Sequence, residues 1–133
     1  MTTAIVWFRR DLRLADNAAL AHALANADRV VPLYIHAPDE LGAWAPGAAS
    51  NWWLHGSLAA LAQALEQRGA RLVIRRAGSA LAGLRAAIKD SGATLVCWNR
   101  LYEPAEAARD SAITSVLVAA GIEAASFAGH LLL

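Results

Sequence analysis

The sequence predicts an α/β fold, namely a doubly wound, five-stranded parallel sheet in the order 3-2-1-4-5 with helices on both faces. Short apolar runs of strand length alternate with helical patterns along the chain. These runs are apolar throughout rather than alternating, which is typical of parallel strands covered on both sides. Because strand–helix–strand crossovers are right-handed, 3-2-1-4-5 is the natural order for such a chain.

Each expected strand is a short run, mostly rich in β-branched or aromatic residues. The strands are expected at 3–8, 29–35, 71–75, 94–98 and 122–127, and the helices between them at about 16–27, 50–68, 79–91 and 104–120. The longest loop, residues 36–48, carries two prolines and two glycines. Two kinds of residue mark the helix ends. Side chains that accept hydrogen bonds from backbone amides mark the starts, and glycines with a left-handed backbone mark the positions just past the ends. The expected signals are Asp16, Ser50 and Ser79 as N-caps, Pro104 at a first helical position, and Gly69, Gly92 and Gly121 just past a helix.

Composition narrows the class of protein. A chain of 133 residues forms one domain, and a net charge of +1 gives no general attraction to nucleic acid or anionic membranes. No apolar stretch approaches the roughly 18–20 residues of a membrane span. Arg9 and Arg10 follow the first apolar run, unlike the basic start of a secretion signal. The lone cysteine, Cys97, excludes an internal disulfide, so we expect a cytoplasmic protein.

Hydrophobic residues make up 57% of the chain, above the roughly 45–50% of an average soluble domain. Trp44, Trp52, Trp53 and the leucines at 131–133 contribute apolar surface that one sheet with four helices does not need to bury. We therefore expect the chain to be the first domain of a longer protein. We also expect it to self-associate at high concentration, without a physiological dimer.

Two polar stretches are expected to meet at one crevice. "RRDLR" follows the first strand and "NRLYEPAEAARD" follows the fourth. Open α/β sheets bind ligands beyond the carboxyl ends of the strands where the winding reverses, here between strands 1 and 4. The arginines of the first stretch suit carboxylates, phosphates or the polar edge of a heteroaromatic ring. Alternatively, Asp11 and one arginine pair with Glu103, Glu106 or Asp110 to fix the loops.

Other polar and aromatic side chains have two interpretations each. Glu106 lies one turn into the fourth helix. It either contacts a ligand or pairs with Arg109 at the surface. Tyr102 and Asn99 either contact a ligand or pack within the loop. At least one of the adjacent tryptophans Trp52 and Trp53 is available to a flat ligand or a neighbouring domain, unless it covers the edge between helix and sheet. Core packing is expected of Leu54, Leu58, Leu61, Leu65 and Cys97.

Recognisable catalytic and metal motifs do not occur in the sequence. His22, His36 and His55 have no metal-ligand spacing with Cys97 or carboxylates, so no metal is expected. Neither glycine-rich phosphate loop is present, and no nucleophile–base arrangement is suggested. These residues predict a ligand-binding α/β domain without a catalytic centre.

The stretch "VWFRRDLRLADNAAL" resembles the N-terminal domain of the DNA photolyase and cryptochrome family. The similarity continues in "GAASNWWLHGSLAAL", "VCWNRLYEPAEAARD" and the "FAGHLLL" end, in the family's order and spacing. This resemblance implies a Rossmann-like domain that holds a light-harvesting antenna chromophore: a deazaflavin, a flavin or, less readily, a methenyltetrahydrofolate. It also implies a C-terminal helical domain, beyond this chain, that binds FAD and DNA and splits pyrimidine dimers with light.

The resemblance further implies which residues surround the chromophore. Deazaflavin and flavin types hold it in the α/β crevice, and folate types hold it between the domains, with a glutamate at the position of Glu106. The folate type has an asparagine where Ala105 stands, and many members have arginine where Asn51 stands. The implied chromophore-binding residues are Phe8, Arg9, Arg10, Asp11, Arg13, His36, Ala49, Ser50, Trp53, Tyr102, Glu103 and Glu106.

Three functions stay open at this point. The chain is the antenna domain of a photolyase, the corresponding domain of a cryptochrome-type blue-light receptor, or a stand-alone nucleotide-binding domain like those of stress proteins. The residues that catalyse repair in the family lie outside the matched segments. The chain alone is therefore expected to be non-catalytic.

Overall fold

The computed structural model describes residues 2–9, 12–38, 40 and 48–128, and for residues 48–53 it describes the backbone alone. It contains a five-stranded parallel sheet in the order β3-β2-β1-β4-β5, which confirms the predicted topology. The strands are β1 (Thr3–Phe8), β2 (Arg29–His36), β3 (Val73–Arg76), β4 (Leu95–Asn99) and β5 (Glu123–Phe127). The helices are α1 (Ala18–Asn26), α2 (Ala48–Glu66), α3 (Ala80–Ser91) and α4 (Pro104–Ala119).

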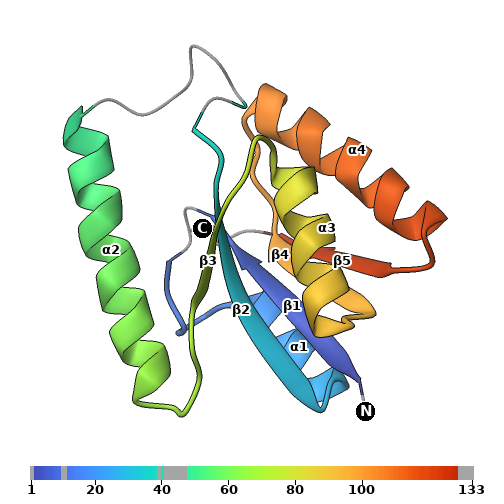
Figure 1. Cartoon of the computed structure of the whole chain (residues 1–133), viewed down its shortest axis with the longest axis horizontal. Coiled ribbons are helices and arrows are strands. Elements are labelled where there is room, and N and C mark those ends of the chain that lie inside the picture. The colour runs from blue at the N-terminus through green and yellow to red at the C-terminus, as the bar shows by residue number, and fades with distance from the viewer. Residues whose placement is uncertain (1, 10–11, 39, 41–47, 129–133) are drawn as a thin grey trace.

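Helices cover both faces of the sheet (Figure 1). On the face of α3 and α4, Ile5, Leu33, Val96 and Trp98 form a core with Leu84, Ile113 and Leu117. On the face of α1 and α2, Val6, Phe8 and Cys97 pack with Leu20, Leu61 and Leu65. Successive residues of a strand point to opposite faces, so the runs that are apolar throughout supply both cores. β1 and β4, at the centre, are buried at every position.

Two of the expected helix starts are wrong, and the others are confirmed. The N-cap of α1 is Asn17, whose side-chain Oδ1 accepts a hydrogen bond from the Leu20 amide at 3.0 Å, and not Asp16. Asp16 has a left-handed backbone (φ 52°) in the preceding turn, a conformation that aspartate tolerates better than most residues. Ser50 lies inside α2, which begins at Ala48. Ser79 caps α3, and Pro104 opens α4.

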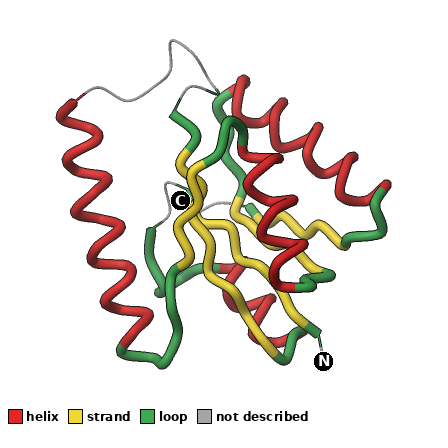
Figure 2. Tube along the Cα trace, viewed as in Figure 1, coloured by secondary structure: helices red, strands yellow, loops and turns green. Residues whose placement is uncertain are grey.

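Among the described side chains of helix α2, those in its C-terminal half pack on the sheet. Leu61 and Leu65 are buried, as expected, whereas Leu54 and Leu58 are only half-buried. In the views of Figures 1 and 2, α2 stands beside the edge strand β3, apart from the other helices. Ile74 and Arg76 of β3 are exposed, whereas every residue of the central strands β1 and β4 is buried. Within the described part of the chain, no helix has the length and apolar character needed to cross a membrane.

Candidate functional site

The crevice between β1 and β4 is filled by a buried arginine. Arg9, directly after β1, donates from Nη1 to Asp110 Oδ2 of α4 at 2.8 Å and from Nη2 to the carbonyl oxygen of Asn99. Its guanidinium also lies over the ring of Trp7, 4.4 Å from the centroid. The side chains of Arg9 and Asp110 are only 7% and 10% exposed. This ion pair joins the end of β1 to the second turn of α4.

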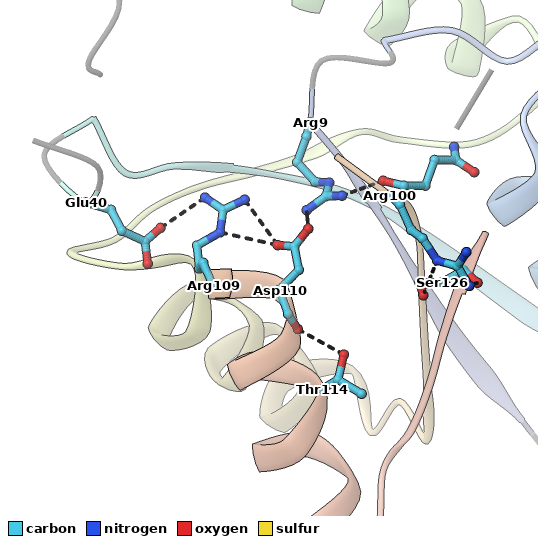
Figure 3. Close-up of polar contacts among 8 residues, drawn as sticks. Arg9, Glu40, Arg100, Arg109, Asp110, Thr114 and Ser126 are labelled. Atoms are coloured by element: carbon cyan, nitrogen blue, oxygen red, sulfur yellow. Dashed lines mark hydrogen bonds and ion pairs between the residues drawn. The ribbon is translucent and has the colours of Figure 1, made fainter. Parts of the chain in front are cut away.

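A second arginine extends this network to α3. Arg109 lies 3.3 Å from Asp110 Oδ1 and 3.4 Å from Glu40 Oε1, so that both Arg109 and Arg9 approach Asp110 (Figure 3). Glu40 Oε1 also accepts a hydrogen bond at 3.0 Å from the amide of Ala80, the first residue of α3. A carboxylate at this position is favoured by the helix dipole. Glu40 thus ties the segment after β2 to α3 and α4.

Two buried asparagines connect β4 with α1. Asn99 Oδ1 accepts from the amide of Ala19 at 3.1 Å, and Asn99 Nδ2 donates to Asn17 Oδ1 at 2.9 Å. Asn17 Nδ2 in turn donates to the carbonyl of Arg13 at 3.0 Å. These bonds fix the loop after β1 and satisfy polar groups that would otherwise be costly to bury. Asn99 therefore has a structural role in this network.

The two polar stretches meet at this switch point as expected, since Arg9 contacts Asn99 and Asp110. For Arg9 the structure agrees with the alternative interpretation, in which an arginine pairs with Asp110 to fix the loops. Asp11, which that interpretation also invoked, and Arg10 lie outside the described residues. The side chain of Arg13 lies away from the ion pair of Arg9: it lines a hollow against α2, and its Nε donates to the carbonyl of Ala15 at 3.2 Å.

The more open surface lies at the carboxyl ends of β2 and β3. Phe8, Tyr34 and Ile74 are register partners across β1, β2 and β3, and they share the face of α1 and α2. Phe8 is fully buried, Tyr34 is half-buried and Ile74 is 55% exposed. The exposure of these three side chains therefore increases towards the edge of the sheet. His36 and Arg76 are register partners two residues further along β2 and β3, on the same face of the sheet. Burial raises the pKa of the Tyr34 phenol.

The remaining expected contacts are dispersed. Tyr102 is 59% exposed and Glu103 is exposed before α4, whereas Glu106 is buried in the first turn of that helix. Arg109, the surface partner suggested for Glu106, contacts Glu40 and Asp110. Ala49, Ser50 and Trp53 belong to the part of α2 whose side chains are not described, as does Trp52, and Trp44 lies outside the described residues. The structure therefore brings together only part of the expected set.

Sequence reasoning gave Glu40 and Asn17 no role. Glu40 lies in the long loop after β2, where local pattern gives no partner for it. Asn17 had a local signal, because it directly precedes the first helical residue and asparagine is a preferred N-cap. The aspartate beside it carries the same signal.

Metal and thiol chemistry find no support among these residues. Across residues 2–9, 12–38, 40 and 48–128, no group of three or more histidine, cysteine or carboxylate side chains could hold a metal ion. Cys97 is fully buried. Burial, with a smaller contribution from the Glu123 carboxylate, raises the pKa of its thiol from 9.0 to about 11, so the thiol is not ionised at neutral pH.

Comparison with known proteins gives matches over nearly the whole chain. Residues 4–133 match the family model for DNA photolyase. The deoxyribodipyrimidine photo-lyase of Agrobacterium fabrum is 47% identical over 128 residues, which cover 96% of this chain and 26% of that protein. Cryptochrome-1 of Arabidopsis thaliana is 43% identical over 129 residues, which cover 97% of this chain and 19% of that protein.

Solved structures agree with these matches. The class III photolyase of Agrobacterium tumefaciens has a TM-score of 0.90 and 44% identity, with 99% of this chain and 27% of that chain covered. An archaeal photolyase from Sulfolobus tokodaii, solved with two FAD molecules that implicate a novel light-harvesting cofactor, has a TM-score of 0.85 and 30% identity. That match covers 98% of this chain and 30% of the archaeal chain. The chain spans between 19% and 30% of the length of these four relatives.

Proposed function

The chain belongs to the DNA photolyase family, and on this premise we propose that it is the light-harvesting-cofactor domain of a deoxyribodipyrimidine photolyase. The observation that carries the proposal is the 47% identity to a photolyase over 96% of the chain. Light-driven repair of pyrimidine dimers is then an activity of the full-length protein. A helical domain beyond this chain binds FAD and DNA, and the 133 residues form the antenna domain alone.

The described residues fit a flat heteroaromatic chromophore beside β2 and β3. The ring of Tyr34 and the exposed side chain of Ile74 offer an apolar surface, and His36 and Arg76, register partners two residues further along, offer polar groups on the same face. Small-molecule sites combine such an apolar surface with a few polar groups that fix orientation. A guanidinium can stack on an aromatic ring and donate to its polar edge. A bound deazaflavin or flavin would absorb light there, and these side chains would orient it.

Of the expected contacts, His36 belongs to this surface and Arg9 to the network of Asp110. His36 remains the expected contact best placed to face a chromophore, whereas Arg9 is engaged with Asp110 and supports the site indirectly. Glu106 is the residue that a folate-type antenna would require, and Ala105 beside it favours the deazaflavin or flavin type. Phe8 is the buried inner member of the row with Tyr34 and Ile74, and it supports the site from the core.

Titration with a chromophore tests this proposal. Flavin mononucleotide, added to the purified chain, is expected to bind weakly and to lose fluorescence on binding. We expect the substitution Arg76→Gln to weaken binding about tenfold, because a hydrogen bond to a charged group is lost. Arg85→Gln is the matched control, since Arg85 is exposed on α3, which packs on the opposite face. Equal affinity in both variants would show that the chromophore does not bind beside β2 and β3.

A cryptochrome-type light receptor is the second candidate, supported by 43% identity to cryptochrome-1 of Arabidopsis thaliana. Both functions use a light-absorbing cofactor, so the fold of this domain fits either. Repair of a dimer-containing oligonucleotide by the full-length protein under blue light separates them. Light-dependent repair supports the photolyase, and its absence with intact FAD photoreduction supports the receptor.

A further inference from the structure

A hollow of about 250 Å³ lies between the loop after β1 and the C-terminal half of α2, and the proposed function does not use it. Its apolar lining includes Leu12, Leu14 and the buried Leu61. Arg13, on the loop, and Arg68, just after α2, are its charged residues. We call it the loop–α2 hollow. It contains none of the four residues proposed to face the chromophore.

The charged side chains described in the lining of the loop–α2 hollow are both positive. Among the described residues that line it, Gln67 and the two arginines are polar and none is a carboxylate. Within the described ranges, Arg9, Arg75 and Arg109 each pair with a carboxylate, whereas Arg13 and Arg68 pair with none. The one side-chain bond of Arg13 uses Nε and leaves both terminal nitrogens available to a ligand. The hollow therefore complements an anion.

The loop wall of the hollow is held in place before any ligand binds. Asn17 Nδ2 donates to the carbonyl of Arg13, and Asn17 itself accepts a hydrogen bond from the buried Asn99. The opposite wall is helical and is anchored by Leu61 and Leu65 in the core. A site between rigid elements loses less entropy on binding than one that must be ordered. Both walls thus belong to the stable part of the fold.

We propose that the loop–α2 hollow binds a small carboxylate with an apolar body. The leucines and alanines would contact the body, and Arg13 and Arg68 would hold the carboxylate at the rim. The volume lies just below the roughly 300–1,000 Å³ of pockets that hold drug-sized ligands, which suits a compact molecule. A guanidinium binds a carboxylate through two parallel N–H donors, so arginine at both rim positions favours this group.

Amide chemical-shift mapping with 2-naphthoate tests the proposal. We expect saturable shifts at residues 12–14 and 60–68 and about tenfold weaker binding by the Arg13→Gln/Arg68→Gln variant. The neutral analogue 2-naphthalenemethanol should bind several-fold more weakly. Ala64→Leu, which fills the hollow from a half-buried helix position, should abolish these shifts while the rest of the amide spectrum stays folded.

Arg29→Gln/Arg85→Gln is the matched control, because it removes two exposed arginines that do not line the hollow. It should leave the affinity for 2-naphthoate unchanged. The proposal is overturned if the shifts fall outside residues 12–14 and 60–68, or if the Arg13/Arg68 variant binds as well as the control. Equal binding of 2-naphthalenemethanol would equally overturn it, since the hollow would then be an apolar surface without anion selectivity.

Discussion

Asp110 is the residue on which the polar network depends. It accepts from Arg9 and Arg109, and the Arg9 pair is almost fully buried. Removing one partner of a buried ion pair leaves an uncompensated charge, so we expect Asp110→Ala to lower the free energy of unfolding by about 3–5 kcal/mol. Urea unfolding followed by circular dichroism measures this difference.

The exposed pair Arg75–Asp90 provides the control. Its side chains are 30% and 62% exposed, and we expect Asp90→Ala to lower the free energy of unfolding by at most about 1 kcal/mol. The double variant Arg9→Met/Asp110→Leu, which replaces both charges by apolar groups, should recover most of the lost stability. If Asp110→Ala were as mild as Asp90→Ala, Arg9 would not depend on its carboxylate partner.

The buried thiol of Cys97 makes stability fall at alkaline pH. Its pKa rises from 9.0 in the unfolded chain to about 11 in the fold, so the folded protein holds the proton more tightly. The resulting stabilisation is complete below about pH 9 and is lost as the pH approaches about 11, amounting to at most about 2–3 kcal/mol. Unfolding free energies measured across this range should fall less steeply for Cys97→Ala. Identical slopes would show that Tyr34 or other groups carry the effect.

At the scale of elements, helix α3 packs so closely on β2 that its glycine has no room for a side chain. A Cβ added at Gly83 would lie 2.8 Å from Ile35 Cγ2. We expect Gly83→Ala to destabilise the fold by about 1–3 kcal/mol through overpacking, despite the better helix propensity of alanine. Thermal unfolding of the two proteins measures the change.

Gly56 provides the matched comparison in α2. A Cβ there would have nothing within 4 Å, so Gly56→Ala should stabilise the protein by about 0.5–1 kcal/mol through helix propensity alone. Ile35→Ala in the Gly83→Ala background should relieve the clash, making the double variant better than the sum of the two single effects. Stabilisation by Gly83→Ala alone would mean that α3 can shift away from β2.

The elements were predictable because their signals are local. Most strands are short apolar runs and the helices are longer periodic segments, so all nine described elements lie within about two residues of the expected bounds. The error at the start of α1 arose where Asp16 and Asn17, both suitable caps, stand side by side. For α2 the periodicity was right, but it could not show that Leu61 and Leu65 would be buried while Leu54 and Leu58 would be only half-buried.

At the scale of the whole molecule, the strand order followed from handedness, whereas the network of side chains did not follow from the sequence. Arg9 and Asp110 are 101 positions apart, and the sequence offers several arginines and carboxylates that could have paired across the same crevice. The choice between them depends on three-dimensional side-chain packing, such as the contact of Arg9 with the ring of Trp7. The expected self-association through Trp44, Trp52, Trp53 and the leucines at 131–133 stays a prediction, since these side chains are not described.

The central claim is that this domain binds a light-harvesting chromophore rather than a nucleoside triphosphate such as ATP. Parallel titrations of the purified chain with flavin mononucleotide, a deazaflavin, methenyltetrahydrofolate and ATP, followed by induced circular dichroism in each ligand's absorption band, test it most directly. We expect one of the two flavin-type compounds to give a saturable signal at one molecule per chain, and ATP to give none. Saturable binding of ATP, with no signal from any of the three chromophores, would contradict the claim.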